Sequence, residues 1–464
     1  MSSMKFLLRI VLFICLPVVG VANENECNDR ACLVCDGLAE EHHYAEGIMK
    51  AMRFIAPGKG TWLFRSDYDL SNDFGLPKPY RKEFRRLIQA FRDQGTEVVM
   101  IVQPTRGLMQ ADSVDPGFAY GFDFAEARKN YQRFLKQLAK EGAVVPDLMP
   151  LLSYPRKQDY FFRRDHHWTP AGAAETARMV ADTIIAMPVY DELEKKAYIT
   201  EPGTYLPKDG TMNGALRRIC GNNFGFQYVP GFQTVPAESG EDALFGDASD
   251  PQVVLVGTSN SAERDDDYKN YNFSGFLKEY LSLDILNYSL PGGGQDGAIQ
   301  QYLLSPEYDP ANAPKLVFWE LPASYHLDDP LMYRQLLPAI KGGCSTASAK
   351  LMEASHDIGA LPKGERVEIL SNAGRAQKNL KGTKGFFELT FSNKNVKDFY
   401  LITYYDNGER DKVWYRRPNV VDGGTYHLEL SQESQFRKAN LMSVFFEPSE
   451  PMEEGTHMEI SLCR

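Results

Sequence analysis

The hydrophobic pattern of the chain changes near residue 345. Before this point, continuous apolar runs alternate with stretches that have the period of amphipathic helices. After it, short runs rich in aromatic and β-branched residues follow one another with turn residues between them. Parallel strands need helical crossovers, whereas antiparallel strands can be joined by short turns. The sequence therefore predicts an α/β domain with a parallel sheet, followed by an all-β domain.

The first part of the chain contains four apolar runs that are typical of buried strands. They span residues 96–104, 250–261, 283–294 and 313–323. Helices are expected at residues 80–94, 124–141, 170–187 and 296–304. Strands of a parallel sheet are apolar on both faces because helices cover both. We therefore expect a parallel sheet covered by helices on its two sides.

The last part of the chain is expected to form an antiparallel β-sandwich. Its short segments, such as GFFELTFS and FYLITYYD, are separated by turn residues that include Asn407-Gly408 and Gly423-Gly424. With the leader described next, the predicted divisions are a signal peptide at 1–22, an α/β domain at 23–343 and a β-sandwich at 344–464.

The first residues have the features of a secretory signal peptide. Lys5 and Arg9 flank the apolar stretch IVLFICLPVVG, and the small residues Gly20 and Ala22 follow it. The apolar stretch is short for a membrane span, and no later segment is long and apolar enough to cross a bilayer. We expect cleavage after Ala22 and an exported protein that does not span the membrane.

Cysteine usage agrees with export. Of the seven cysteines, Cys15 lies in the leader, which leaves an even number in the mature chain. The remaining six are Cys27, Cys32, Cys35, Cys220, Cys344 and Cys463. An even count in an exported chain favours disulfides, although the spacing leaves the pairing open. Zinc at Cys27, Cys32 and Cys35 is the less favoured alternative, because no fourth ligand follows at a finger-like spacing.

The charge balance limits the possible partners. The formal net charge is -11 at pH 7, so the chain as a whole lacks the basic footprint of a nucleic-acid-binding protein. An acidic protein can still bind a polyanion through a local basic groove. We therefore expect no nucleic-acid partner.

The segment RRDHHWTPAGA, residues 163–173, contains the densest group of reactive side chains. Thr169 can cap a helix whose first residue is Pro170, so Asp165 and His167 lie on the loop before it. Ser259 follows a predicted strand in a Gly-Thr-Ser turn. Because ligands bind beyond the carboxyl ends of parallel strands, these groups can meet as nucleophile, base and orienting acid. Backbone N–H groups at 292–294 and at 321–325 could stabilise an oxyanion.

Each of these features also has a simpler interpretation. A Gly-Thr-Ser sequence after a strand is commonly only a turn, and Asp165 could simply interact with a helix dipole. The glycines at 292–294 could hold a phosphate, but no Lys-Ser/Thr pair follows them. His166 has no partner by this logic and is interpreted as structural. A metal-dependent phosphoesterase built on the Asp-His-His sequence would need further metal-ligand motifs, and His42 and His43 lack metal-like surroundings. No metal or cofactor is expected.

Several separated blocks of the sequence resemble those of one protein family. They are DHHWTPAGA, LVGTSNS, GGG, WELPASYH, GTWLFRSDYDLSNDFG and QPTRG. In their order along the chain they resemble the blocks of the AlgX/AlgJ family of alginate O-acetyltransferases, from about Cys35 to the C-terminus. The resemblance implies an SGNH-hydrolase-like α/β domain followed by a β-sandwich carbohydrate-binding module.

The resemblance also implies roles for individual residues. The family's triad falls on Asp165, His167 and Ser259, and two tyrosines near the site match Tyr271 and Tyr325. Gly293 belongs to the expected oxyanion turn. The implied disulfides are Cys35–Cys220 and Cys344–Cys463, which leaves Cys27 to pair with Cys32. The implied polymer-binding residues of the sandwich are Tyr404, which stands where the family has tryptophan, Arg410 and Trp414.

The function expected from this resemblance is acetyl transfer in the periplasm. The protein would move an acetyl group from a donor through Ser259 to a hydroxyl of alginate or polymannuronate, as a monomer within the alginate secretion complex. An acetylesterase with the same acyl-enzyme, and a non-catalytic polysaccharide-binding scaffold, are the alternatives. The donor and the modified hydroxyl are not determined by the sequence.

Overall fold

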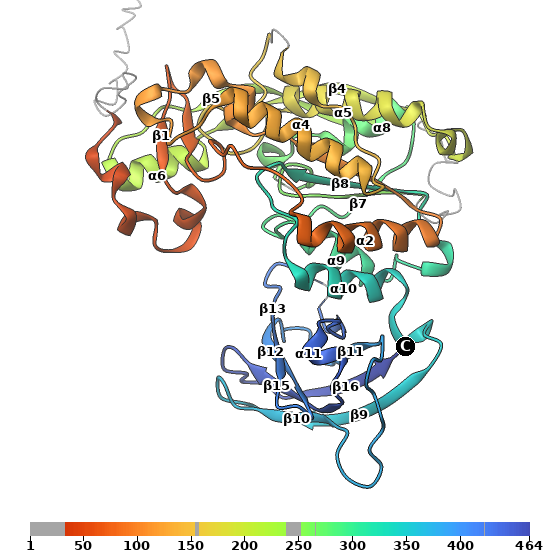
Figure 1. The fold of residues 1–464 in the computed structure, drawn as a ribbon. Helices are drawn as coiled ribbons and strands as arrows, with labels where there is room; N and C mark the ends of the chain where they lie inside the picture. The colour runs from red at the N-terminus through yellow and green to blue at the C-terminus, as the bar shows by residue number, and fades with distance from the viewer. Residues whose placement is uncertain (1–32, 154–156, 238–251, 265, 422) are drawn as a thin grey trace, which may run out of the picture.

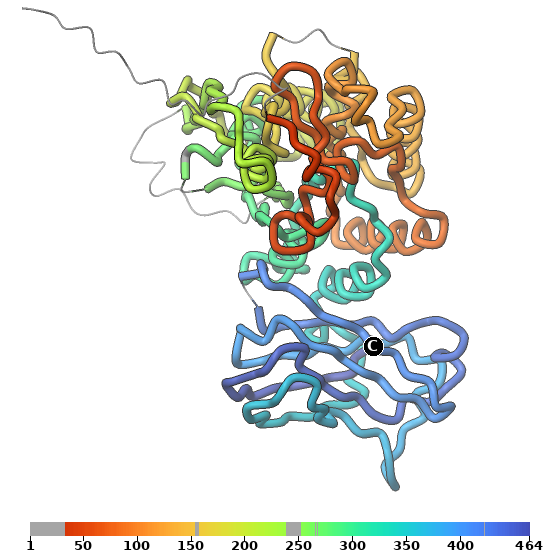
Figure 2. Tube along the Cα trace, turned by 90° about the vertical axis from the view of Figure 1, so that its left-hand side faces the viewer, coloured from red at the N-terminus to blue at the C-terminus, as the bar shows by residue number. Residues whose placement is uncertain are grey.

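The computed structural model describes residues 33–464 except 154–156, 238–251, 265 and 422. The signal peptide predicted at 1–22 and the pair Cys27 and Cys32 lie outside the described residues. An α/β domain is followed by a domain of antiparallel strands, as Figures 1 and 2 show in two views. The predicted fold class is therefore confirmed.

The α/β domain is built on a four-stranded parallel sheet. In spatial order its strands are β3 (Glu97–Gln103), β8 (Leu316–Pro322), β6 (Val253–Val256) and β7 (Leu286–Asn287). All four predicted strands are present, but β6 and β7 are shorter than their apolar runs. The chain leaves the sheet after Val256 and after Asn287, and these exits form the loops around the candidate site.

Side chains of successive residues in these strands enter two different cores. Val98, Met100 and Val102 of β3 belong to one core, which also holds residues of four helices: α2 (Arg81–Asp93), α4 (Phe124–Lys140), α9 (Gly297–Leu303) and α10 (Pro330–Ile340). Val99 and Ile101 belong to the other core, with α5 (Pro170–Ile185) and α8 (Phe273–Leu281). Helices thus cover both faces of the sheet, as the continuous apolar strands predict.

A hairpin and a helix that the sequence analysis did not predict join the edge of this domain. The hairpin consists of β4 (Tyr198–Lys208) and β5 (Gln227–Pro236), and α6 (Thr211–Cys220) lies in the connection between the two strands. Proline and glycine within β4 argue against a strand, but a two-stranded ribbon tolerates both because few of its N–H groups need partners.

The segment before the sheet packs against α6 as a small separate core. It contains η1 (Asp36–Ala39), η2 (Glu41–Tyr44), η3 (Gly47–Met52), β1 (Ile55–Pro57) and β2 (Leu63–Arg65). Leu38, Tyr44 and Met52 are buried against Leu216 of α6. The predicted disulfide Cys35–Cys220 is present and joins this segment to the end of α6.

Several short helices lie in the connections. They are α3 (Arg106–Met109), η4 (Lys78–Tyr80), η5 (Ala111–Ser113), η6 (Pro116–Phe118), η7 (Met149–Leu152), η8 (Pro188–Glu192), η9 (Asp267–Lys269), η10 (Pro310–Asn312), η11 (Gly343–Ser345) and α11 (Ser434–Arg437). Among the described helices, none is long and apolar enough to cross a bilayer.

The C-terminal domain consists of two four-stranded antiparallel sheets. One contains β10 (Val367–Ser371), β15 (Leu441–Pro448), β12 (Asp398–Tyr405) and β13 (Arg410–Arg416), in that spatial order. The other contains β14 (Thr425–Glu429), β11 (Phe386–Phe391), β16 (Thr456–Cys463) and β9 (Lys350–Ile358). Their shared core includes Phe387, Leu401, Tyr415 and Phe446. The sequence analysis missed β9, an edge strand whose polar residues hide the alternation.

The two domains are in direct contact through α2, α9 and α10, which lie between the parallel sheet and the sandwich (Figure 1). Arg334 of α10 forms a 2.6 Å ion pair with Asp411, and Arg86 of α2 forms one of 2.6 Å with Glu429. Val420 of the sandwich is part of the α/β core. The predicted disulfide Cys344–Cys463 ties the start of the second domain to its last strand.

Candidate active site

The loop that carries Asp165 and His167 is fixed at both of its ends. Thr169 caps α5 by accepting a hydrogen bond from the Gly172 N–H at 3.2 Å, as the sequence predicts. On the other side, the buried Arg106 guanidinium donates to the carbonyls of Phe162 at 2.6 Å and Asp165 at 2.7 Å. Asp69 lies 3.3 Å from Arg106 Nε and balances its charge. Arg106 thus holds the loop by its backbone.

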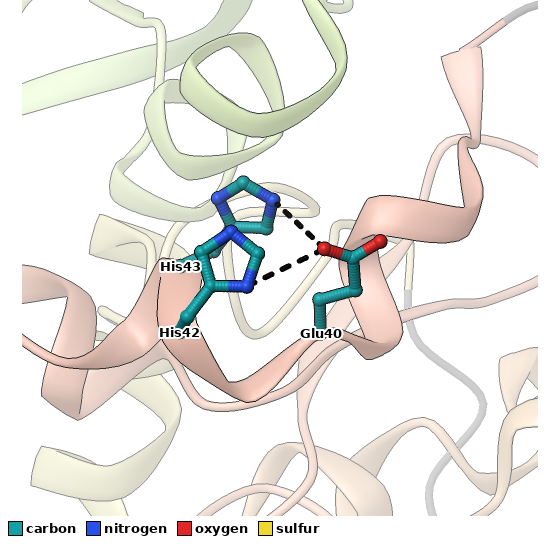
Figure 3. A group of neighbouring side chains, drawn as sticks. All are labelled: Glu40, His42 and His43. Carbon is teal, nitrogen blue, oxygen red and sulfur yellow. Dashed lines mark ion pairs between the residues drawn. The ribbon is translucent and has the colours of Figure 1, made fainter.

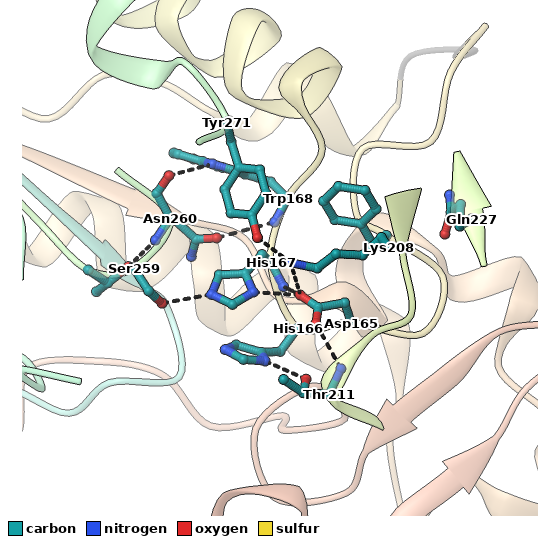
Figure 4. A network of polar contacts seen from close by, with 12 residues as sticks. Asp165, His166, His167, Trp168, Lys208, Thr211, Gln227, Ser259, Asn260 and Tyr271 are labelled. Atoms are coloured by element: carbon teal, nitrogen blue, oxygen red, sulfur yellow. Dashed lines mark hydrogen bonds and ion pairs between the residues drawn. The ribbon is translucent and has the colours of Figure 1, made fainter. Parts of the chain in front are cut away.

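The three residues of the predicted triad are in mutual contact (Figure 4). His167 Nδ1 lies 2.5 Å from Asp165 Oδ1, and His167 Nε2 lies 2.8 Å from Ser259 Oγ. The second carboxylate oxygen of Asp165 accepts the Thr211 N–H at 2.8 Å. In this arrangement Asp165 can orient the imidazole, and His167 can accept a proton from Ser259.

A lysine that the sequence analysis did not identify contacts the acid of this group. Lys208, at the end of β4, places its Nζ 3.6 Å from Asp165 Oδ1 and donates a hydrogen bond to the Tyr271 hydroxyl. Its ammonium also lies over the rings of Phe162 and Tyr271. The fully buried Tyr271 packs near His167, with the rings tilted and their centroids 5.3 Å apart. Tyr271 therefore packs beside the imidazole and holds Lys208.

Burial and neighbouring charges set the protonation states of these groups. Burial alone would raise the pKa of Asp165, but His167 and Lys208 outweigh it and hold that pKa well below its usual range. Burial lowers the pKa of His167, Asp165 acts in the opposite direction, and the charge of Lys208 lowers it further. At neutral pH the carboxylate is therefore charged and the imidazole is neutral, which is the state a general base requires.

The turn that carries Ser259 rests on a buried glutamate. Glu320 of β8 accepts hydrogen bonds from the Thr258 N–H at 2.8 Å and from the Ser261 hydroxyl at 3.0 Å. A side chain at position 257 would lie 2.8 Å from this carboxylate, so the turn requires Gly257. Asn260 accepts from the Trp168 N–H at 3.2 Å and thereby links this turn to the histidine loop.

A cavity of about 350 Å³ opens beside Ser259 and His167. Its lining includes Tyr325 and Gly293, as expected, and also the cation Arg264. No described acidic residue lies within ion-pair distance of Arg264, so its charge is available to an anion in the cavity. The sequence analysis did not identify Arg264.

The glycine turn expected to stabilise an oxyanion lines the cavity, but one of its N–H donors is occupied. The Gly293 N–H donates to the Leu290 carbonyl at 3.1 Å. The Ser259 N–H has no acceptor among the described residues. The Ser259 N–H is therefore one available backbone donor, the N–H groups of Gly292 and Gly294 also have no acceptor among the described residues, and Gly293 contributes the shape of the cavity wall.

His166, interpreted from the sequence as structural, does have partners in the structure. His166 Nδ1 lies 2.7 Å from the Thr211 hydroxyl, and its ring packs against that of His167, tilted by 37°, with centroids 3.8 Å apart. His166 also lines the cavity. It supports the imidazole of His167 while facing the same space as Ser259.

Asp165, His166 and His167 are close enough to share a metal ion, but their surroundings do not suit one. Both oxygens of Asp165 accept backbone N–H groups, and the Lys208 ammonium lies 3.6 Å from one of them. His166 Nδ1 is already bonded to Thr211. The Lys208 ammonium thus already supplies a positive charge to Asp165.

The three predicted polymer-binding residues share the outer face of one sheet in the sandwich. Tyr404 of β12 is paired with Arg410 of β13, and Tyr400 is paired with Trp414. The Tyr400 and Trp414 rings are stacked with centroids 5.7 Å apart. Lys412 lies over the Tyr400 ring at 3.9 Å. This face therefore combines flat aromatic surfaces with positive charge.

A parallel-sheet domain with a serine at a strand end, followed by an antiparallel sandwich, is the architecture of SGNH-hydrolase-like proteins that carry a carbohydrate-binding module. Residues 55–323 match the family described as SGNH hydrolase-like domain, acetyltransferase AlgX. Residues 343–464 match a C-terminal carbohydrate-binding module. The chain belongs to the AlgX family.

Individual relatives agree with this assignment. The alginate biosynthesis protein AlgX of Pseudomonas syringae pv. tomato is 33% identical over 97% of this chain and 93% of its own. The solved structure of Pseudomonas aeruginosa AlgX has a TM-score of 0.81 at 31% identity and covers 93% of this chain and 100% of its own. A Pseudomonas syringae protein named probable alginate O-acetylase AlgJ is 31% identical over 58% of this chain and 68% of its own.

Proposed function

We propose that this protein is a periplasmic O-acetyltransferase that acetylates alginate or its polymannuronate precursor through an acetyl-serine intermediate. The observation that carries the proposal is the contact of His167 Nε2 with the Ser259 hydroxyl at 2.8 Å, while Asp165 holds Nδ1. The names of the AlgX and AlgJ relatives support the substrate and the transferred group.

In the first half of the reaction, Ser259 Oγ attacks the carbonyl carbon of the acetyl donor, and its proton moves to His167 Nε2. The tetrahedral oxyanion is stabilised by the Ser259 N–H. Tyr325 is a further donor at the cavity wall, because burial raises the pKa of its hydroxyl and keeps it protonated. Collapse breaks the bond to the donor oxygen, which takes the proton from His167, and leaves acetyl-Ser259.

In the second half, a hydroxyl of the polymer attacks the acetyl carbon. His167 takes the proton of that hydroxyl and returns it to Ser259 Oγ as the ester bond to serine breaks. The acetyl group ends on the sugar and the enzyme is restored. The same base therefore serves both halves, which requires its imidazole to be neutral at the start of each.

The distribution of cations supports an acidic polymer as acceptor. Arg264 faces the cavity beside Ser259. A second cavity, of about 240 Å³, lies between the domains and is lined by Gly292 and Gly293 on one side and by Trp414 and Arg416 on the other. The glycine turn lines both cavities, which places the sandwich close to the cavity at Ser259; Asp296 and Asp329 also line the second cavity, so Trp414 and Arg416 are the groups expected to contact a polyuronate there.

The relatives' part in alginate biosynthesis also bears on location and partners. We assign residues 23–343 to catalysis and 344–464 to polymer binding, after removal of a leader at 1–22. The protein would act as a monomer alongside the other proteins of the alginate secretion complex. The two disulfides fit an oxidising compartment.

A product assay distinguishes transfer from hydrolysis. The mature protein is incubated with a defined mannuronate oligomer and a generic acetyl ester, and the oligomer is examined by mass spectrometry. Transfer predicts acetylated oligomer that is absent with Ser259→Ala. Release of acetate alone would identify an acetylesterase. Oligomer binding without any turnover would identify a scaffold.

A further inference from the structure

A second group of metal-ligating side chains lies outside the lining of the Ser259 cavity, at the start of the short helix η2 in the N-terminal segment (Figure 3). Glu40, His42 and His43 each direct one ligand atom into the same space, and these atoms lie within 4.8 Å of one another. Glu40 Oε2 is 3.4 Å from His42 Nδ1 and 3.7 Å from His43 Nε2. From the sequence, His42 and His43 lacked metal-like surroundings, whereas in the structure both lie next to the carboxylate of Glu40.

These separations suit a tetrahedral metal ion. Zinc binds imidazole nitrogen and carboxylate oxygen at about 2.0 to 2.2 Å, which places two ligands of a tetrahedral site roughly 3.3 to 3.6 Å apart. The measured 3.4 and 3.7 Å are close to that range. We propose that Glu40, His42 and His43 bind one Zn²⁺ ion, with a water molecule from solvent as the fourth ligand.

The backbone that carries the three ligands is held in place. Tyr44 follows them and is buried, and its hydroxyl donates to the Leu38 carbonyl at 2.9 Å and accepts the Ile55 N–H at 3.1 Å. The disulfide Cys35–Cys220 lies just before them. An ordered turn reduces the conformational entropy that metal binding would otherwise have to overcome.

The charges around Glu40 favour a cation. The adjacent Glu41 is neutralised by Arg53, whose Nη2 lies 3.0 Å from it. In contrast, the described part of the chain brings no lysine or arginine within ion-pair distance of Glu40. The Asp165 group also combines one carboxylate with two imidazoles, but Lys208 already supplies its positive charge. The Asp165 group therefore has a neighbouring cation and the Glu40 group has none among the described residues, and this difference favours metal binding at Glu40.

The position of the ligands indicates what the ion would do. His42 and Glu40 are 70% and 54% exposed, so the ion would be reached directly from solvent. It would join the residues before and within η2 and so stabilise the N-terminal segment. It would take no part in chemistry at Ser259, and the proposal is independent of the acetyltransferase assignment.

The test measures zinc binding to the untagged mature protein after chelator treatment, by calorimetry and by thermal unfolding. We expect one equivalent of Zn²⁺ and a rise in Tm, because a ligand that binds the folded state stabilises it. The double variant His42→Gln/His43→Gln should bind at least about tenfold more weakly. Its Tm without metal should equal that of the wild type, because both side chains reach the surface. Excess Mg²⁺, which prefers oxygen ligands, should not compete.

His457→Gln is the matched control. His457 is also an exposed histidine with acidic neighbours, Asp357 and Glu459, but these contact opposite nitrogens of its ring and cannot share an ion with it. This variant should bind zinc as the wild type does. Absence of zinc binding, equal binding in the double variant, or loss with His457→Gln would overturn the proposal. Binding that survives in the double variant and blocks ester hydrolysis would place the ion at His167 instead.

Discussion

The Lys208 ammonium lies 3.6 Å from the Asp165 carboxylate, so the acid of the candidate triad is shared between the His167 imidazole and a lysine cation. The two residues come from different elements, because Asp165 precedes α5 and Lys208 ends β4. The hairpin β4–β5 therefore contributes directly to the electrostatics of the site. Its effect is to lower the pKa of the imidazole that must accept protons.

We predict that Lys208→Met shifts the acid limb of the pH–rate profile to higher pH. The neutral form of His167 is the base, so activity is lost as the pH falls through its pKa. Lys208 lowers that pKa, and its removal should raise it and bring the loss of activity closer to neutral pH. Hydrolysis of a small acetyl ester across a pH series measures the shift. Lys196→Met, which removes an exposed lysine paired with Asp284, should leave the profile unchanged.

Trp414→Ala should weaken acetylation of long oligomers several-fold and leave hydrolysis of a small ester unchanged. Trp414 is 45% exposed, stacks on Tyr400 and lines the cavity between the domains. Stacking on a sugar face needs this ring, whereas the chemistry at Ser259 does not. Initial rates with short and long oligomers provide the measurement. Tyr205→Ala, at an exposed aromatic of the hairpin, is the control. Equal losses on polymer and ester would point to a damaged fold.

In the sandwich, the alternation of side chains along a strand predicts which residues share a face, but not which residues meet the other domain. Arg410, Lys412 and Trp414 fall on the outer face with Tyr404, as a period of two requires. Arg417 follows the strand and donates to Gln335 of α10 in the interface between the domains. Alternation alone could not assign Arg417 to this interface, because the face that meets the other domain depends on tertiary packing.

We expect the stability of the domain interface to depend on pH through Asp296. Burial, followed by the nearby Asp329, raises the pKa of Asp296 to about 6. Between the unfolded pKa of about 4 and this value, the folded state binds more protons, so stability falls as the pH rises. Asparagine carries no charge, so the Asp296→Asn variant should not lose stability in this way as the pH rises.

The Tm of Asp296→Asn should therefore exceed that of the wild type by a few degrees at about pH 7.5, and the difference should shrink at about pH 4. Asp112→Asn, at an exposed position, is the control. A difference between Asp296→Asn and wild type that stays constant with pH would show that the carboxylate is not responsible.

The disulfide between Cys344 and Cys463 should be a large contributor to the stability of the sandwich. It closes a loop with a sequence separation of 119 residues. On the chain-entropy model, a loop of this size gives about 4 to 5 kcal/mol. Replacing both cysteines by serine should lower the free energy of unfolding of the sandwich by about this amount, as measured by denaturant titration. A loss below about 1 kcal/mol would be inconsistent with this role.

The sequence located Asp165, His167 and Ser259 because each follows a strand or precedes a helix with a clear local signal. It could not locate Lys208, Arg264, Arg106 or Glu320. Lys208 lies on a hairpin whose proline and glycine residues hide the strand, and Arg264 lies in a loop without periodicity. Glu320 follows an apolar run, so its carboxylate gains meaning only when β8 is placed next to β6. These roles arise from contacts between segments that are far apart in the chain.

The most direct test of the account is detection of the acyl-enzyme on Ser259. The wild-type protein is mixed with a generic acetyl ester without acceptor, quenched in acid and digested, and the peptide that contains Ser259 is sequenced by mass spectrometry. We predict one acetyl group on Ser259, which disappears when mannuronate oligomer is added before the quench. Ser259→Ala should carry no such group, whereas Ser261→Ala should still form it. Acetylation of another residue, or undiminished turnover by Ser259→Ala, would contradict the account.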